Sequence, residues 1–143
     1  ELSTGNLLTA GTLSNDCLPL GKIEIIDDQF FGLDEGDEND QQLDENIFRL
    51  VANNGTEDYS VLNLFATDWK EEENEKELMG FGFESLDGES ICRVEVTGGG
   101  LTENYNMIPC ADWGFDFTTP LREGKPQPAI SHIVFYYCKL DWD

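Results

Sequence analysis

Basic side chains are scarce in this sequence. Lys and Arg total 8 against 30 Asp and Glu, which gives a formal net charge of -22 over 143 residues. Such a surface repels phosphate backbones and anionic lipids, so nucleic acid and anionic membrane surfaces are excluded as partners. The charge also destabilises a compact state unless salt screens it, because the Debye length falls from ~10 Å at 0.1 M to ~3 Å at 1 M. The composition therefore favours a halophilic protein or one that binds divalent cations.

Long apolar runs are missing as well. No stretch approaches the ~20 apolar residues that a transmembrane helix needs, so membrane insertion is not expected. The chain begins at Glu1, which we interpret as the start of a mature, processed product. A length of 143 residues suits a single domain.

Histidine occurs only once, as His132. It follows Ser131, and adjacent residues of a strand point to opposite faces, so the two side chains cannot act as base and nucleophile. With 30 carboxylates in the chain, pairs suited to glycoside hydrolysis arise by chance and carry no information. The sequence therefore predicts a protein that is not an enzyme and has no catalytic residues.

The four cysteines, Cys17, Cys92, Cys110 and Cys138, are even in number and lack the close spacing of zinc ligands. Two disulfide bonds are the better interpretation, and they indicate an oxidising, extracellular or cell-surface location. Four cysteines allow three connectivities. We favour Cys17–Cys138, which joins the start of the domain to its last strand, with Cys92–Cys110 closing a shorter loop.

Short apolar runs alternate with polar, glycine-containing loops. This pattern predicts strands over 18–26, 30–33, 46–52, 59–66, 78–86, 91–96, 101–108 and 130–137. About eight or nine strands separated by turns indicate an all-β fold, an antiparallel β-sandwich of Greek-key or jelly-roll type with little helix. Segment 69–78 has good helix formers and few apolar residues, so it predicts a helical turn or an exposed acidic loop.

Two polar segments contain candidate ligand or modification sites. In the acidic loop 34–46, Asp34, Asp37 and Asp40 are candidate ligands for a structural calcium ion, although the spacing is not that of an EF-hand and a solvated charge run is the alternative. Asn54-Gly55-Thr56 is an N-glycosylation sequon in a predicted turn, so Asn54 is a candidate glycosylation site.

Aromatic residues are a further candidate for binding. They suit either a sugar-stacking platform or the packing of a β-sandwich, and we favour packing. The residues concerned are Trp69, Trp113, Trp142, Tyr105, Tyr136 and Tyr137.

Two stretches resemble known families. Residues 3–13 (STGNLLTAGTL) resemble the mature N-terminal region of TasA/camelysin-like proteins, which SipW-type signal peptides export. Residues 94–138 resemble a β-domain of secreted bacterial and haloarchaeal surface proteins through VEVTGG at 94–99 and ISHIVF at 130–135. Thr97 stands where that pattern usually has lysine. Cys138 comes two residues late, a shift that keeps it on the same strand face.

The first resemblance implies polymerisation, in which the N-terminal segment of one subunit completes the sandwich of its neighbour. Residues 1–10 suit this role because, in an extended strand, their side chains would alternate between two faces, and because no residue after Glu1 is charged. We therefore predict a donor strand at 1–10, a single β-sandwich domain at 11–143, and a head-to-tail homopolymer that forms an extracellular filament, pilus or biofilm-matrix fibre. The predicted donor-strand residues are Leu2, Thr4, Asn6, Leu7 and Leu8.

Two alternatives stay open. Residues 1–10 also suit an ordinary first strand within their own domain. The protein as a whole also suits a monomeric cell-surface binding module, an adhesin or carbohydrate-binding domain.

Overall fold

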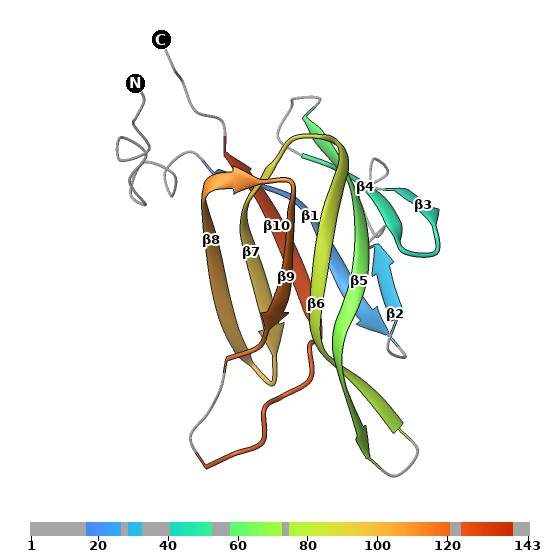
Figure 1. Ribbon diagram of the computed structural model, residues 1–143, viewed down its shortest axis with the longest axis vertical. Coiled ribbons are helices and arrows are strands. Elements are labelled where there is room, and N and C mark those ends of the chain that lie inside the picture. Colours follow the sequence, from blue (N-terminus) through green and yellow to red (C-terminus); the bar gives the residue numbers. More distant parts are fainter. Residues whose placement is uncertain are drawn as a thin grey trace.

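The computed structural model describes residues 17–26, 29–32, 41–52, 58–72, 75–120 and 124–138 (Figure 1). All regular secondary structure in these residues is β-strand, so the all-β prediction is confirmed. No helix that is long and apolar enough to cross a membrane occurs in this part of the chain. The strands are β1 (Cys17–Ile26), β2 (Gln29–Gly32), β3 (Gln41–Asp44), β4 (Ile47–Val51), β5 (Tyr59–Glu72), β6 (Glu75–Gly88), β7 (Ile91–Gly98), β8 (Leu101–Ala111), β9 (Trp113–Thr118) and β10 (His132–Cys138).

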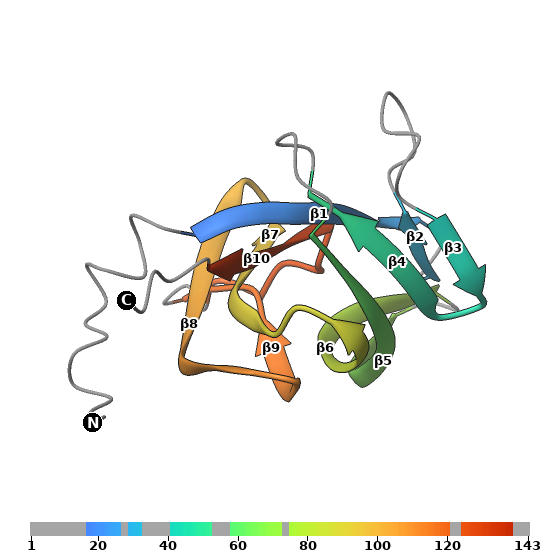
Figure 2. The same ribbon diagram turned by 90° about the horizontal axis from the view of Figure 1, so that it is seen from above.

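The strands form two antiparallel sheets packed face to face, which confirms the predicted sandwich. Sheet 1 has the order β2-β1-β10-β7-β8, and sheet 2 has the order β3-β4-β5-β6-β9. The last strand, β10, lies between β1 and β7 and pairs with both. Figure 2 shows β1 and β10 on one side of the molecule and β5, β6 and β9 on the other.

Buried side chains from both sheets form one core. In β10, Ile133, Phe135 and Tyr137 are fully buried and alternate with half-buried residues, as expected for a strand with one face in the core. Phe81 and Phe83 of β6 meet Phe135 edge to face, with ring centroids 6.3 Å and 5.8 Å apart. Each such buried side chain contributes about 1.5–3 kcal/mol of stability.

Segment 69–78 belongs to a long hairpin, so the prediction of a helical turn or an exposed acidic loop is wrong. β5 and β6 pair from Ser60 to Glu72. The ammonium group of Lys76 lies 4.9 Å from the ring centroid of Trp69, and Glu71 is the cross-strand partner of Lys76. Cross-strand pairs of this kind stabilise a hairpin by about 0.2–1 kcal/mol each. Helix propensity is a weak preference that such pairing overrides.

The sequence analysis also missed β3 and β9. β3 lies in the segment expected to be a solvated loop, and its residues 42–44 are exposed. A short, polar edge strand lacks the alternation of apolar and polar residues that reveals strands in a sequence. In β9 an extra residue breaks that alternation, as described below.

Candidate functional surfaces

Most of the predicted site residues lie outside the described part of the chain. These residues are Leu2, Thr4, Asn6, Leu7 and Leu8 of the predicted donor strand, Asn54 of the sequon, and the candidate calcium ligands Asp34, Asp37 and Asp40. The roles assigned to them stay predictions.

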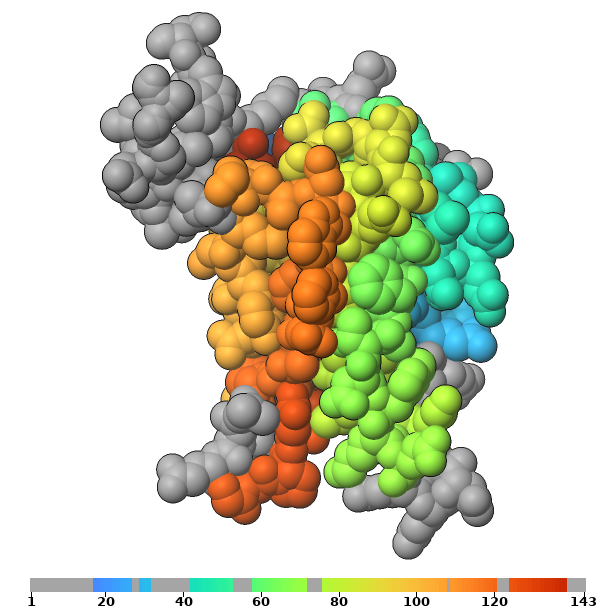
Figure 3. Space-filling model, viewed as in Figure 1, coloured from blue at the N-terminus to red at the C-terminus, as the bar shows by residue number. Residues whose placement is uncertain are grey.

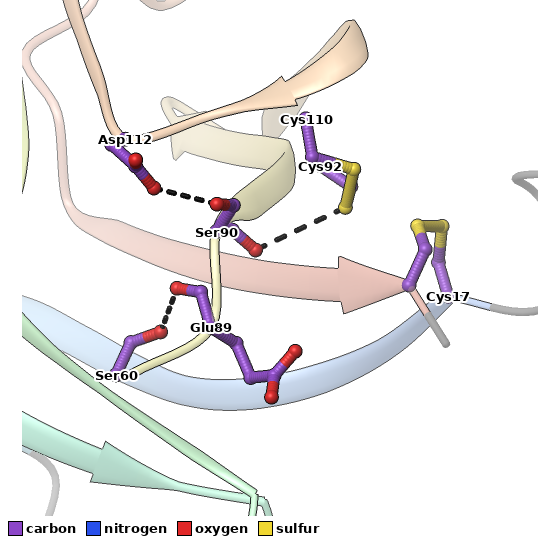
Figure 4. The surroundings of a disulfide bond; sticks show 8 residues. Cys17, Ser60, Glu89, Ser90, Cys92, Cys110 and Asp112 are labelled. Carbon is purple, nitrogen blue, oxygen red and sulfur yellow. Dashed lines mark hydrogen bonds between the residues drawn. A yellow bond between two sulfur atoms is a disulfide. The ribbon is translucent and has the colours of Figure 1, made fainter. Parts of the chain in front are cut away.

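The four cysteines form the two disulfide bonds that the sequence analysis favoured. Cys17–Cys138 joins the start of β1 to the end of β10, and Cys92–Cys110 joins β7 to β8. Figure 4 shows the two bridges near each other, and the sulfur atoms of Cys92, Cys110 and Cys138 all lie within 4.8 Å of one another. Because these sulfurs are bonded in pairs, they do not offer the thiolates that a metal ion requires. The bonded pairs are compatible with an oxidising, extracellular environment.

The first half of β1 is an open sheet edge within the described structure. β2 pairs only with residues 23–26 of β1, so residues 18–22 have no described strand on that side. The N–H of Ile25 donates to the carbonyl oxygen of Ser131 at 2.9 Å, on the β10 side. Successive residues of a strand direct their N–H groups to opposite sides, so the N–H of Lys22 points to the open edge. Such an edge is a template for an additional strand.

His132 lies half-buried at the start of β10, among charged residues of neighbouring strands. Burial lowers the pKa of His132, and so does the nearby Lys22 ammonium, while Glu24 and Glu95 act in the opposite direction. The Oγ of Ser131 lies 3.5 Å from the His132 Nδ1, but it donates to the carbonyl oxygen of Thr97 at 3.0 Å. Since its proton is engaged there, Ser131 lacks the short contact to a base that activates a serine nucleophile.

Four large aromatic side chains of sheet 2 are exposed: Trp69, which packs against Lys76 on the β5–β6 hairpin, and three others on β5 and β9. Phe65 of β5 is 38% exposed, Trp113 of β9 63% and Phe115 of β9 56%. The rings of Trp113 and Phe115 are parallel, with planes 8° apart and centroids 5.6 Å apart. β5, β6 and β9 lie side by side on the surface seen in Figure 3. We call Phe65, Gly82, Trp113 and Phe115 the aromatic face. Exposed apolar clusters of this kind mark interaction sites.

A β-bulge in β9 produces this arrangement. Where β9 pairs with β6, Phe115 and Asp116 together lie opposite the single residue Gly82. Asp116 has a φ of 63°, a left-handed conformation that aspartate adopts more readily than most residues. The extra residue resets the alternation, so that Trp113 and Phe115 point outward while Phe117 is buried in the core. Bulges often re-aim side chains beside functional sites.

Gly82 forms the floor of the aromatic face. A Cβ at this position would lie 2.6 Å from the Phe65 ring and 2.6 Å from the carbonyl oxygen of Gly114. The Phe65 ring therefore covers Gly82, and no side chain rises between Phe65 and β9. In the adjacent cross-strand row, Asn63 and Glu84 are partners, so that amide and carboxylate oxygens border the rings.

The aromatic residues considered as a sugar-stacking platform or as packing residues differ in their exposure. Tyr137 is fully buried, as the packing interpretation predicts. Trp113 is exposed and does not pack in the core, and Trp142 lies outside the described residues. Phe65 and Phe115 were missed. For Phe115, the two-residue spacing from Trp113 is the signal that places both side chains on one strand face.

No protein-family profile, curated protein sequence or solved structure that was compared with the chain matches it. The resemblances to TasA/camelysin-like proteins and to secreted surface β-domains therefore stay predictions.

Proposed function

We propose that the protein is a non-enzymatic structural subunit of an extracellular filament, assembled when residues 1–10 of one copy add as a strand to the sandwich of the next. The observation that carries this proposal is the open edge along residues 18–22 of β1. A donated strand pairs with the N–H and C=O groups of that edge, beside which no strand is described, and places its side chains beside the core.

The position of the edge supports an open fibre. Residues 1–10 precede Cys17, which begins the strand that carries the open edge and is covalently fixed to Cys138 of β10 on the other side. Donor and acceptor are different surfaces of one chain, so the contact is heterologous and repeats head to tail unless the rotation closes a ring. A net charge of -22 makes neighbouring subunits repel, and salt or cations reduce that repulsion.

Two variants separate the donor from the acceptor. Deleting residues 1–10 removes the donor and leaves the edge of β1 intact. Lys22→Pro removes the N–H that points to the open edge, without removing a hydrogen bond to β10, since proline is tolerated where the N–H of an edge strand faces outward. Lys22→Gln is the matched control, because it removes the same charge and keeps the N–H.

The assay is negative-stain microscopy and sizing chromatography at high salt. The parent and Lys22→Gln proteins should form fibres, and each of the other two variants should stay a folded monomer. A mixture of the deletion and Lys22→Pro variants should form one-to-one dimers and no fibres, because only one junction can form. Fibres from the deletion variant alone would sink the proposal.

A further inference from the structure

The aromatic face has no role in the proposed strand exchange, since it lies on sheet 2 and uses neither residues 1–10 nor the edge of β1. We propose that this face binds an uncharged polysaccharide, whose pyranose rings pack against the exposed aromatic surface of Trp113, Phe115 and Phe65. The C–H groups on one side of a pyranose ring form an apolar surface that packs on an aromatic ring. Its hydroxyl groups project sideways and require hydrogen-bond partners at the border of the site.

The geometry meets both requirements. The rings of Trp113 and Phe115 stack on each other with centroids 5.6 Å apart, and the Phe65 ring lies over Gly82. A chain of sugars that crosses β6 would therefore meet exposed aromatic surface on β9 and again on β5. Asn63 and Glu84 are cross-strand partners next to these rings, and their side-chain oxygens accept hydrogen bonds from hydroxyl groups.

The bulge gives independent support. Asp116 holds a φ of 63° in the middle of a strand pair. Left-handed backbone at a non-glycine residue costs free energy, and it tends to persist where a site requires it. Here it leaves Trp113 and Phe115 in solvent, while Phe117, two residues further on, is buried in the core.

Charge selects the class of ligand. Glu84 and Asp116 are exposed beside the rings, and the whole chain carries a net charge of -22. Polymers of uronic acids, sulfated sugars or phosphates are repelled by such a surface. A second copy of this chain is disfavoured for the same reason, because a symmetric contact would bring the acidic borders of two copies together.

Affinity electrophoresis of the full chain in native gels tests the proposal. The gels contain hydroxyethylcellulose or galactomannan as neutral probes, and polygalacturonate as the anionic probe. At least one neutral polymer should retard the parent protein, and polygalacturonate should not. Trp113→Ala and Phe115→Ala should each weaken the retardation about tenfold or more, the usual effect of truncating a central aromatic contact. Trp69→Ala is the matched control, since Trp69 is a partly exposed tryptophan that packs against Lys76 on the β5–β6 hairpin.

Thermal unfolding of every variant shows whether the variant is folded. If Trp113→Ala does not fold, Phe115→Ala tests the same site. The proposal is overturned if no neutral polymer retards the parent, if polygalacturonate is bound equally well, or if Trp69→Ala weakens binding as much as Trp113→Ala. Sedimentation equilibrium adds a further arm: dimers of the parent that Trp113→Ala abolishes would make the face a contact between copies and overturn the glycan proposal.

Discussion

The two disulfide bonds should differ in their contribution to stability, because they close loops of very different length. Cys17–Cys138 spans a sequence separation of 121, and Cys92–Cys110 spans 18. In the chain-entropy description, a cross-link stabilises the folded state by restricting the unfolded chain, and the effect grows with the logarithm of loop length. The long loop is then worth about 5 kcal/mol and the short loop about 3 kcal/mol at 25 °C.

Burial reduces this difference. Cys92 is only 3% exposed, so replacing it with alanine also removes a buried atom, which costs about 0.8 kcal/mol. We therefore expect the double variant Cys17→Ala/Cys138→Ala to lose about 5 kcal/mol of unfolding free energy. The variant Cys92→Ala/Cys110→Ala should lose about 4 kcal/mol. Paired replacement matters, because a single replacement would leave a thiol within exchange distance of the other bridge.

Urea unfolding at fixed high salt, without reductant, measures both quantities. The unfolding free energies show which variant loses more stability. The dependence of the unfolding free energy on urea concentration, the m-value, gives a second test. Opening the longer loop lets the unfolded chain expand more, so the slope should rise more for Cys17→Ala/Cys138→Ala. If the short-loop variant loses more stability, or if neither slope rises, the entropic reasoning is refuted.

Three further predictions concern titration, packing and salt. The pKa of His132, measured by NMR titration, should lie below 6.5. The contribution of neutral His132 to the unfolding free energy should then be fully present above pH 6.5 and should be lost as the pH falls from 6.5 to the folded-state pKa. A measured pKa at or above 6.5 would contradict this. Gly82→Ala should lower the unfolding free energy by about 1–3 kcal/mol, because the new Cβ meets the Phe65 ring and the rigid Gly114 carbonyl; calorimetry that finds no loss would disprove the close packing. The urea midpoint should rise between 0.1 and 1 M NaCl, with most of the gain below ~0.5 M, where screening changes fastest; a flat response would show that the charge of -22 is not destabilising.

The parts of the fold that sequence reasoning predicted are those with strict alternation. β10 reads as a strand because every second residue, ending at Tyr137, is apolar and buried. The preferred disulfide pairing was also right, because it required only that the first and last strands be neighbours. The β5–β6 hairpin tip was not predictable in this way, since its pairing depends on cross-strand contacts such as Lys76 with Trp69.

The aromatic face was beyond the sequence for a similar reason. Its outward rings depend on the bulge at Asp116, and a bulge interrupts the two-residue period from which burial is inferred. Without the register between β6 and β9, nothing assigns Phe115 to the solvent and Phe117 to the core. The need for glycine at position 82 follows only from the Phe65 ring that lies over it, and the sequence does not reveal that contact.

The bridge between Cys17 and Cys138 has a mechanical consequence. If the chain is pulled through the segments before Cys17 and after Cys138, the tension passes directly from one cysteine to the other through a covalent bond. The 120 or so residues between them are bypassed, so pulling cannot unravel the sandwich or lengthen the molecule. The domain would behave under traction as an almost inextensible link, and it would become an extensible one only after reduction.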